Sequence, residues 1–249
     1  MGCAFACSAP QSTASSLLIL AGMFQDRHDA AVQLAGQLIA YQGQHPLVLG
    51  IPRGGVPMAR HIAEVLHGDL DVAMARKIAH PLLPEYAIGS VDESGWTYYS
   101  PFADSVMRNP ADLDVEKLRQ LDVIRRRRSQ YTPSRGPLDV RNRVVIVVDD
   151  GLATGATMRA ALHEVRSRQP SQLVCAVPVA SQESLRQIRP LVDALICVQT
   201  PSNLEAISRH YRHFPTVEDA EVIRCLRNPL HASQTQPEPH DERQATRLP

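Results

Sequence analysis

The sequence predicts an α/β fold with a central, mostly parallel sheet covered by helices on both faces. The main observation is a strict alternation in the second half: apolar strand patterns over 144–148, 173–179 and 194–198 enclose helical patterns over 155–168 and 181–188. Such alternation is typical of βαβ units, whose crossovers cover a parallel sheet. A second observation is composition: 249 residues with 44% hydrophobic and 21% charged residues suffice for one sizeable core.

The first half contains similar elements in a less regular order. Apolar residues recur every three or four positions from Asp26 to Ile39, which predicts a helix. An apolar run over 47–51 predicts a buried strand, and a helix over 56–66 follows it and stops near Gly68. We expect a second strand over 70–75, short β pieces over 87–91 and 96–99, and a helix over 114–130 before the breaker at 133–137.

The ends of the chain differ from the middle. Residues 1–22 lack the basic segment of a secretory signal, so we expect a disordered extension, and Met23 is an alternative start of the protein. Residues 229–249 are rich in Pro, Gln, His and charge, which predicts a disordered tail. The expected domain therefore covers residues 23–228.

Charge and cysteine content exclude several classes of protein. Lys plus Arg and Asp plus Glu both number 26, which disfavours a broad nucleic-acid or membrane-binding surface. The chain lacks an apolar run of the roughly 18 residues that a membrane span needs. Five scattered cysteines without a CxxC pair indicate a reducing compartment, so we expect a cytoplasmic protein. We interpret the only dense charge run, 125–128, as a solvated helix end, with nucleic-acid or partner binding as the alternative.

The stretch 143–157, RVVIVVDDGLATGAT, carries most of the chemical information. A buried strand delivers Asp149 and Asp150 to its carboxyl end, where ligands bind in parallel α/β sheets. The loop Gly151, Leu152, Ala153, Thr154, Gly155, Ala156 and Thr157 then opens a helix, whose free N–H groups and dipole favour a phosphate. Paired carboxylates can accept hydrogen bonds from vicinal hydroxyls or bind a hard cation through water. A phosphate site beside a diol site predicts a sugar-phosphate ligand.

This stretch resembles the phosphoribosyl pyrophosphate (PRPP) motif of the type I phosphoribosyltransferases. The resemblance extends from Phe24 to about Leu226 and is closest to the bacterial group labelled "predicted phosphoribosyltransferase". It rests also on Asp26-Arg27, IPRGGVP at 51–57, PEYAIG at 84–89 and Tyr211-x-x-Phe214. The resemblance implies the type I fold with a small hood, ribose hydroxyls on Asp149 and Asp150, and the 5′-phosphate on residues 151–157.

The resemblance also assigns the diphosphate half of PRPP. Arg53, Gly54 and Gly55 follow the first strand where the family places its pyrophosphate loop, and the glycines let backbone approach an anion closely. Arg76 and Lys77 resemble the start of the mobile catalytic loop and would neutralise the leaving diphosphate. The following residues read Ile78-Ala79-His80, where the family pattern has a glycine, so the sequence departs from the family here.

The implied reaction transfers the 5-phosphoribosyl group of PRPP to a small nitrogenous base or related acceptor. The family's Mg²⁺ would be held mainly by PRPP and water, so we expect no dedicated metal cage. Ala153 occupies the position of the acid in relatives that use 6-oxopurines, which leaves Glu85 as the nearest candidate general base. A homodimer is also expected. The alternative function is a PRPP- or nucleotide-sensing regulator of the same fold with little catalysis.

Overall fold

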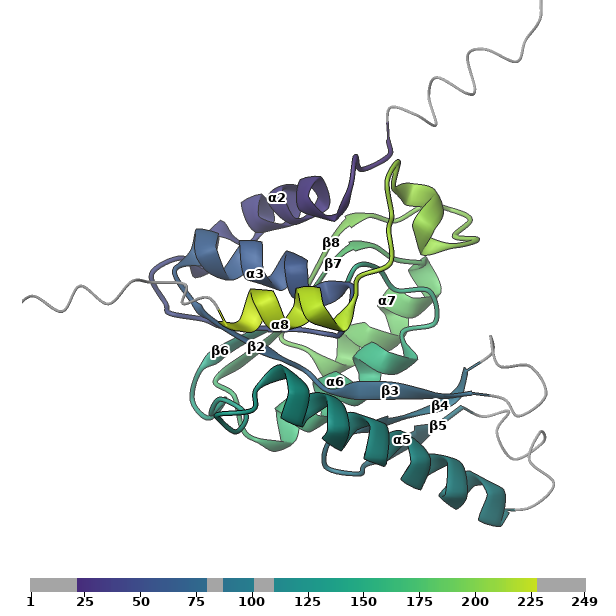
Figure 1. Cartoon of the computed structure of the whole chain (residues 1–249). Helices are drawn as coiled ribbons and strands as arrows, with labels where there is room; N and C mark the ends of the chain where they lie inside the picture. Colours follow the sequence, from purple (N-terminus) through teal and green to yellow (C-terminus); the bar gives the residue numbers. More distant parts are fainter. Residues whose placement is uncertain (1–21, 80–86, 101–109, 228–249) are drawn as a thin grey trace, which may run out of the picture.

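The protein contains a five-stranded parallel sheet and a separate three-stranded antiparallel sheet, seen in a computed structural model (Figure 1). The structure describes residues 22–79, 87–100 and 110–227. The strand order of the large sheet is β2-β1-β6-β7-β8 and that of the small sheet is β3-β4-β5. The predicted α/β fold with a mostly parallel sheet is confirmed.

The large sheet consists of β1 (Leu47–Gly50), β2 (Asp69–Val72), β6 (Val144–Val148), β7 (Gln172–Val179) and β8 (Ala194–Gln199). Alternate residues of each strand point to opposite faces, so the sheet separates two apolar clusters. Val48, Ile146 and Val174 pack against α2 (Arg27–Gln37) and α3 (Gly55–Leu66) on one face. Leu49, Val147 and Cys175 pack against α6 (Ala156–Ser167) on the other.

A third apolar cluster lies under the long helix. The small sheet, formed by β3 (Ala75–Ala79), β4 (Ala87–Asp92) and β5 (Thr97–Tyr99), packs against α5 (Pro110–Tyr131) through Ile78, Val91 and Ile124. The last helix, α8 (Asp219–Arg227), adds Val222 to this cluster. The short helices α7 (Gln182–Ile188), η1 (Ile39–Tyr41), η2 (Arg189–Leu191) and η3 (Ile207–His210) complete the described part of the fold.

The strand expected over 70–75 is present as β2 but ends earlier, at Val72. The chain leaves the large sheet after Val72 and enters the small sheet at Ala75. The intervening Ala73 and Met74 are buried, at 2% and 5% exposure, so the junction is as apolar as the strands it joins. Hydrophobicity therefore cannot mark the break. The helix expected from residue 114 begins at Pro110, since proline is favoured in the first helical turn.

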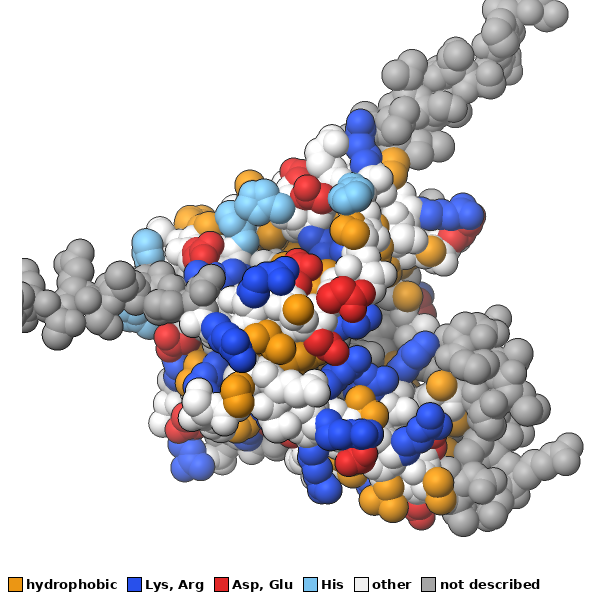
Figure 2. Space-filling view, viewed as in Figure 1, with side chains coloured by type: hydrophobic (Ala, Val, Ile, Leu, Met, Phe, Trp, Pro, Cys, Tyr) orange, Lys and Arg blue, Asp and Glu red, His pale blue; other side chains and the backbone are white. Residues whose placement is uncertain are grey.

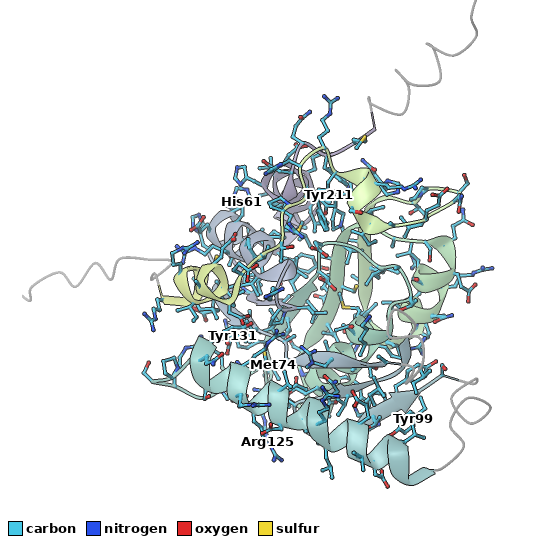
Figure 3. The ribbon with its side chains drawn as sticks, turned by 45° about the vertical axis from the view of Figure 1, so that its right-hand side comes forward. His61, Met74, Tyr99, Arg125, Tyr131 and Tyr211 are labelled. Carbon is cyan, nitrogen blue, oxygen red and sulfur yellow. The ribbon has the colours of Figure 1, made fainter. Side chains whose placement is uncertain are left out.

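The charge run 125–128 was interpreted as a solvated helix end, and this is wrong for Arg128. Arg128 lies on the inner side of α5, with 12% of its side chain exposed, and binds the buried Asp71 at 3.1 Å and Glu93 at 2.7 Å. Figure 3 shows that Arg125 instead points outward from α5. The run thus contains solvated and buried arginines, because consecutive helical positions face different directions.

The helix crossovers create a switch point between β1 and β6. The chain leaves β1 toward α3 on one face and leaves β6 toward α6 on the other. The two loops therefore separate at the carboxyl edge, where ligands bind in open α/β sheets. Residues 200–217 cross this edge, and Phe24 pairs with Tyr211 there in an isolated bridge. They occupy the place of the expected small hood.

Candidate active site

The aspartate pair lies at the switch point, directly after β6. Asp150 N–H donates to Asp149 Oδ1 at 2.9 Å, which fixes the Asp149 carboxylate against the backbone. Burial and the neighbouring Asp150 carboxylate raise the pKa of Asp149 well above its usual value. Burial also raises the pKa of Asp150, and Arg27 opposes that shift. Two carboxylates held this close in a partly desolvated place are suited to accept hydrogen bonds from a diol.

Arg27 is the basic residue that forms an ion pair with Asp150. Its Nε and Nη2 lie 2.9 and 2.8 Å from Asp150 Oδ2, and its Nη1 donates to the Pro215 carbonyl at 2.6 Å. The guanidinium stacks 3.7 Å above the centroid of the Phe214 ring. Tyr211 Oη donates to the Asp150 carbonyl at 2.7 Å, so the backbone of the same residue is also held. Arg27, Tyr211 and Phe214 belong to the motifs of the family resemblance, but the sequence pattern predicted no role for them.

Residues 151–157, predicted to bind a phosphate, enclose a cavity of about 170 Å³ beside Asp149. Gly155 caps α6 in the left-handed region, at φ 71°, without a side-chain cap. The first N–H groups of a helix have no intrahelical acceptor, which makes this end of α6 suited to an anion. The Ala153 carbonyl is anchored to α7, accepting from Ser184 Oγ at 2.5 Å. Ile207 forms the opposite wall. All seven predicted loop residues, 151–157, line this cavity together with Asp149.

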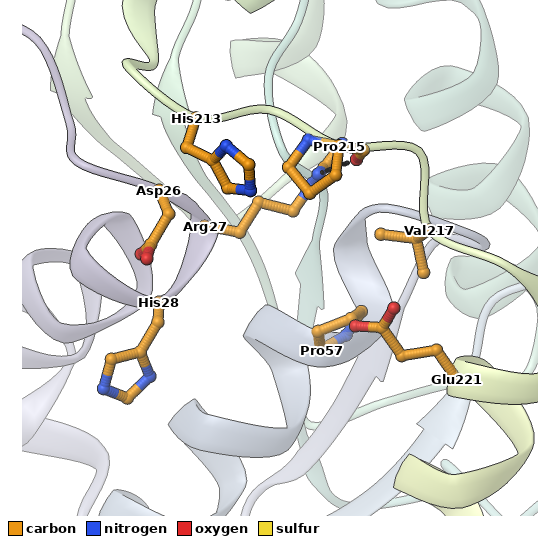
Figure 4. A pocket seen from close by; sticks show the side chains of 8 residues that line it. All are labelled: Asp26, Arg27, His28, Pro57, His213, Pro215, Val217 and Glu221. Atoms are coloured by element: carbon orange, nitrogen blue, oxygen red, sulfur yellow. Dashed lines mark hydrogen bonds between the residues drawn. The ribbon is translucent and has the colours of Figure 1, made fainter.

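A second cavity, of about 230 Å³, lies near Asp150, which Arg27 and Gly54 of its lining contact. It is lined by Arg27, Arg53 and Gly54 and by residues 214–217. Arg27 also borders a neighbouring pocket of about 250 Å³, whose wall contains His28, His213 and Glu221 (Figure 4). The predicted loop residue Arg53 thus faces the same space as Arg27, and its Nη1 lies 3.4 Å from Glu218 Oε2.

The glycines of the 51–57 loop pack closely against the end of β6. A Cβ atom on Gly54 would lie 1.9 Å from Asp150 Oδ2, and one on Gly55 would lie 2.4 Å from the Val148 carbonyl. Each position therefore requires glycine so that this loop can lie against the end of β6. Their close approach is to the aspartate strand. The Pro52–Arg53 peptide bond beside them is cis.

Three arginines, from β3, α5 and the 51–57 loop, lie close enough to interact electrostatically, and Arg53 among them lines the second cavity. Burial lowers the pKa of Arg76 on β3, and the nearby charges of Arg127 on α5 and of Arg53 lower it further. Such like-charge proximity attracts an anion of high charge. Tyr131 is fixed beside this group, donating to Asp219 Oδ1 at 2.5 Å. Arg127 was missed by sequence analysis, since it stood within the run interpreted as solvated.

The two residues of the predicted basic pair, Arg76 and Lys77, point to opposite faces of a strand. Arg76 and Lys77 lie within β3 rather than at its end, and adjacent strand residues face opposite ways. Arg76 faces α5 and donates to Gln120 Oε1 at 2.5 Å, whereas Lys77 is exposed. Glu85, the candidate base, lies outside the described residues.

The described residues contain neither a metal-binding cluster nor a helix that could span a membrane. The described residues contain no group of three His, Cys, Asp or Glu side chains with metal-binding geometry. Within the same residues, the helices are too short or too polar to cross a bilayer. Basic and acidic side chains are interspersed on the face shown in Figure 2, in keeping with the balanced composition.

Comparison with known proteins identifies relatives over most of the chain. The family described as "Phosphoribosyl transferase domain" matches residues 15–211. A Mycobacterium tuberculosis H37Rv protein named "Putative phosphoribosyl transferase" is 35% identical over 208 residues, covering 82% of this chain. The match covers 46% of that protein, so the chain spans about half the length of this relative. A Clostridium novyi protein named "Bifunctional protein PyrR" is 34% identical over 134 residues, which are 53% of this chain and 56% of that protein.

A solved structure supports the fold. The crystal structure of TT1426 from Thermus thermophilus superposes with a TM-score of 0.69 and 38% sequence identity, covering 82% of this chain and 97% of that one. The type I fold expected from the resemblance is therefore confirmed. Together with the family match over residues 15–211, this places the chain in the phosphoribosyl transferase domain family.

Proposed function

We propose that the protein binds PRPP across the switch point and transfers its phosphoribosyl group to a nitrogenous base or related acceptor, releasing pyrophosphate. The observation that carries the proposal is the aspartate pair itself: Asp149 lines the cavity at a helix N-terminus, and Asp150 is paired with Arg27 of the arginine-lined cavity. PRPP has the same order of groups: a 5′-phosphate, a ribose diol, and a diphosphate at the anomeric carbon.

Different residues bind the three groups of PRPP. N–H groups of residues 151–157 bind the 5′-phosphate, and the aspartates accept from the ribose hydroxyls. Arg27 and Arg53 face the diphosphate, with Arg76 and Arg127 supplying further positive charge. Breaking the anomeric C–O bond leaves negative charge on the diphosphate, and fixed cations favour that change. The new bond forms between the anomeric carbon and a nitrogen of the acceptor, whose proton passes to a base such as Glu85.

The donor set fits Mg²⁺ brought in with the ligand. Asp149 and Asp150 are hard oxygen donors beside the place given to the diphosphate, and Asp150 is already paired with Arg27. Diphosphate oxygens and water would therefore supply most of the coordination, which suits an ion that keeps several waters. When bound, the ion would neutralise part of the diphosphate charge.

The test is an assay for pyrophosphate release with PRPP, Mg²⁺ and a panel of purine and pyrimidine bases. PRPP affinity is measured separately by calorimetry. We expect release with at least one base and its loss on chelation of Mg²⁺. The double variant Asp149→Asn with Asp150→Asn should bind PRPP at least ~100-fold more weakly, about 2.7 kcal/mol. Asp122→Asn is the control, since Asp122 is 63% exposed and pairs with Arg126 on α5.

The outcomes separate binding from catalysis. PRPP binding unchanged in the double variant would refute the ribose assignment. Tight PRPP binding without pyrophosphate release in the presence of any base would refute the transferase activity. That result would favour the alternative, a PRPP-sensing regulator.

A further inference from the structure

A cavity of about 510 Å³ lies apart from the aspartate pair, between β5, α6 and η2. In the described part of the chain it shares no lining residue with the two cavities beside Asp149 and Asp150. Its size falls within the range of small-molecule sites, roughly 300–1,000 Å³. The proposed function gives this cavity no role.

One wall of the cavity is aromatic. The Trp96 and His163 rings stack with centroids 3.5 Å apart and planes 9° from parallel. Tyr98 is also part of the wall, and the Arg159 guanidinium lies 4.4 Å from the centroid of the Tyr98 ring. Leu162, Leu191 and Val192 add apolar surface. Flat rings beside aliphatic side chains favour a planar aromatic ligand.

Behind this wall lies a buried carboxylate. Asp92 is fully buried, and its Oδ1 accepts from Ser94 N, Ser94 Oγ and Trp96 N. Its Oδ2 lies 3.5 Å from His163 Nδ1, and neither atom has a hydrogen-bond partner in the described structure. A buried polar atom without a partner is costly and is common at functional sites.

This arrangement positions His163 for a ligand. Its Nδ1 faces Asp92, while 41% of its side chain is exposed. A carboxylate behind Nδ1 favours a proton on that nitrogen, which leaves Nε2 on the exposed side of the ring. The residue therefore combines a stacking surface with a polar edge that reaches the cavity.

The rim of the cavity is cationic. Arg159 and Arg166 both line it, and Asp193 is the acidic residue among the lining side chains. Asp193 pairs with Arg166 at 3.1 Å, while Arg159 donates to the neutral Gln187 at 2.8 Å. Positive charge is thus in excess, so an anionic group is favoured at the edge of the aromatic wall.

We propose that this cavity is a second binding site for a nucleoside monophosphate, with the base stacked on the Trp96–His163 wall and the phosphate on Arg166 and Arg159. A base supplies the planar ring and a phosphate supplies the anion. The site does not depend on the proposed transferase activity, because its residues are separate from the aspartate pair.

Trp96 is the only tryptophan in the chain, so intrinsic fluorescence reports on this wall directly. The experiment titrates AMP, GMP, CMP and UMP into the double variant Asp149→Asn with Asp150→Asn, in which the proposed PRPP site is impaired. Adenosine, guanosine and inorganic phosphate are titrated separately. We expect saturable quenching by at least one nucleotide, and at least ~10-fold weaker binding of its nucleoside and of phosphate.

Arg166→Gln should weaken that nucleotide's binding by about 10-fold or more. Arg186→Gln is the matched control, since Arg186 is 74% exposed on α7 and pairs with Glu183. PRPP binding in the otherwise native chain should be the same with and without Arg166→Gln. Calorimetry repeats the titration without optical interference from the bases.

Three results would overturn the proposal. One is the absence of saturable quenching by any of the four nucleotides. Another is quenching that Arg166→Gln leaves unchanged. The third is Trp96 emission that shifts with protein concentration while sedimentation shows a dimer that Arg166→Gln dissociates, because a second copy of the chain would then cover the wall.

Discussion

Arg27 holds Asp150 in place through an ion pair, while ring stacking on Phe214 and a bond to the Pro215 carbonyl fix the guanidinium itself. Because 12% of the Arg27 side chain and 18% of the Asp150 side chain are exposed, water screens this pair only partly. Arg27 thus acts on the proposed ligand both through Asp150 and as part of the cavity wall.

Arg27→Gln should weaken PRPP binding in a pH-dependent way. Burial raises the pKa of Asp150 and Arg27 opposes this, so removing the cation raises that pKa further. A smaller share of Asp150 is then ionised at a given pH, and the loss of affinity should be greatest at low pH and shrink as pH rises. Calorimetry between pH 5.5 and 8.5 measures PRPP affinity, and we expect this affinity to fall at least ~10-fold at the acidic end.

Arg27→Lys is the control because it keeps the positive charge. It should retain most of the native pH profile while losing part of the affinity. A deficit in Arg27→Gln that is equal at every pH would show that Arg27 acts on the ligand alone and not on the ionisation of Asp150.

The aspartates and the loop after them were predictable, whereas Arg27 was not. An apolar strand, two acids and a glycine-hydroxyl turn are contiguous, and parallel-sheet geometry fixes where they lie. The Arg27–Asp150 contact spans 123 positions of the chain, and local patterns carry no information about such a contact. Arg127 was hidden for a different reason, since only the packing of α5 decides which arginine of the run faces inward.

Among the elements, the 51–57 loop depends on glycine most strictly. Gly54→Ala would place a Cβ atom 1.9 Å from Asp150 Oδ2, so the loop or the carboxylate must move. We expect a loss of stability of about 2 kcal/mol and PRPP binding weakened at least ~10-fold. Urea unfolding and calorimetry measure the two effects.

Gly36→Ala is the matched control. Gly36 lies in α2, is exposed, and has nothing within 4 Å of an added Cβ. Alanine there should stabilise the protein by about 0.5–1 kcal/mol, because glycine is a poor helix former. If Gly54→Ala bound PRPP as the native chain does, the close packing of loop and strand would be irrelevant to the site.

On α5, two neighbouring arginines should respond differently to substitution. Arg128→Ala leaves Glu93 and the buried Asp71 without one of their cations, and Asp71 then retains only Arg135 among the described basic side chains. We expect a loss of about 3 kcal/mol in the free energy of unfolding. Arg126→Ala should change it by less than about 0.5 kcal/mol, since that pair is 67% and 63% exposed. Equal losses in urea unfolding would contradict the assignment of Arg128 to the interior.

The strands and helices between residues 144 and 199 were predicted nearly to the residue, because each strand is a continuous apolar run bounded by turns. Helix α8 was not predicted. Neither was the break between β2 and β3. Ala73 and Met74 are apolar for the same reason as the strands, namely burial, but they belong to the junction of two sheets. Which sheet a strand joins is a property of tertiary pairing.

At the scale of the whole molecule, the site combines both ends of the described chain. Arg27 begins α2, while Tyr211, Phe214 and Asp219 come from the last segment and α8. The paired Phe24 and Tyr211 rings, 5.4 Å apart, hold these ends together over the carboxyl edge.

PRPP binding should therefore protect both ends against amide hydrogen exchange. We expect slower exchange in α2 and in residues 209–217 on addition of PRPP, as well as in the loop of residues 151–157. Arg27→Gln should reduce the protection of residues 209–217 more than that of the loop. Protection confined to residues 151–157 would mean that the ends do not respond to the ligand.

This joining of the ends has a consequence for the protein during its synthesis. The aspartate strand and the loop of residues 151–157 leave the ribosome well before residues 211–219, so the sheet can begin to form around them. Arg27 is made early but lacks the Phe214 ring and the Pro215 carbonyl that hold its guanidinium. A nascent chain that ends before these residues therefore carries the whole motif without a finished site, and affinity for the proposed ligand is gained only after residues 211–219 have been made.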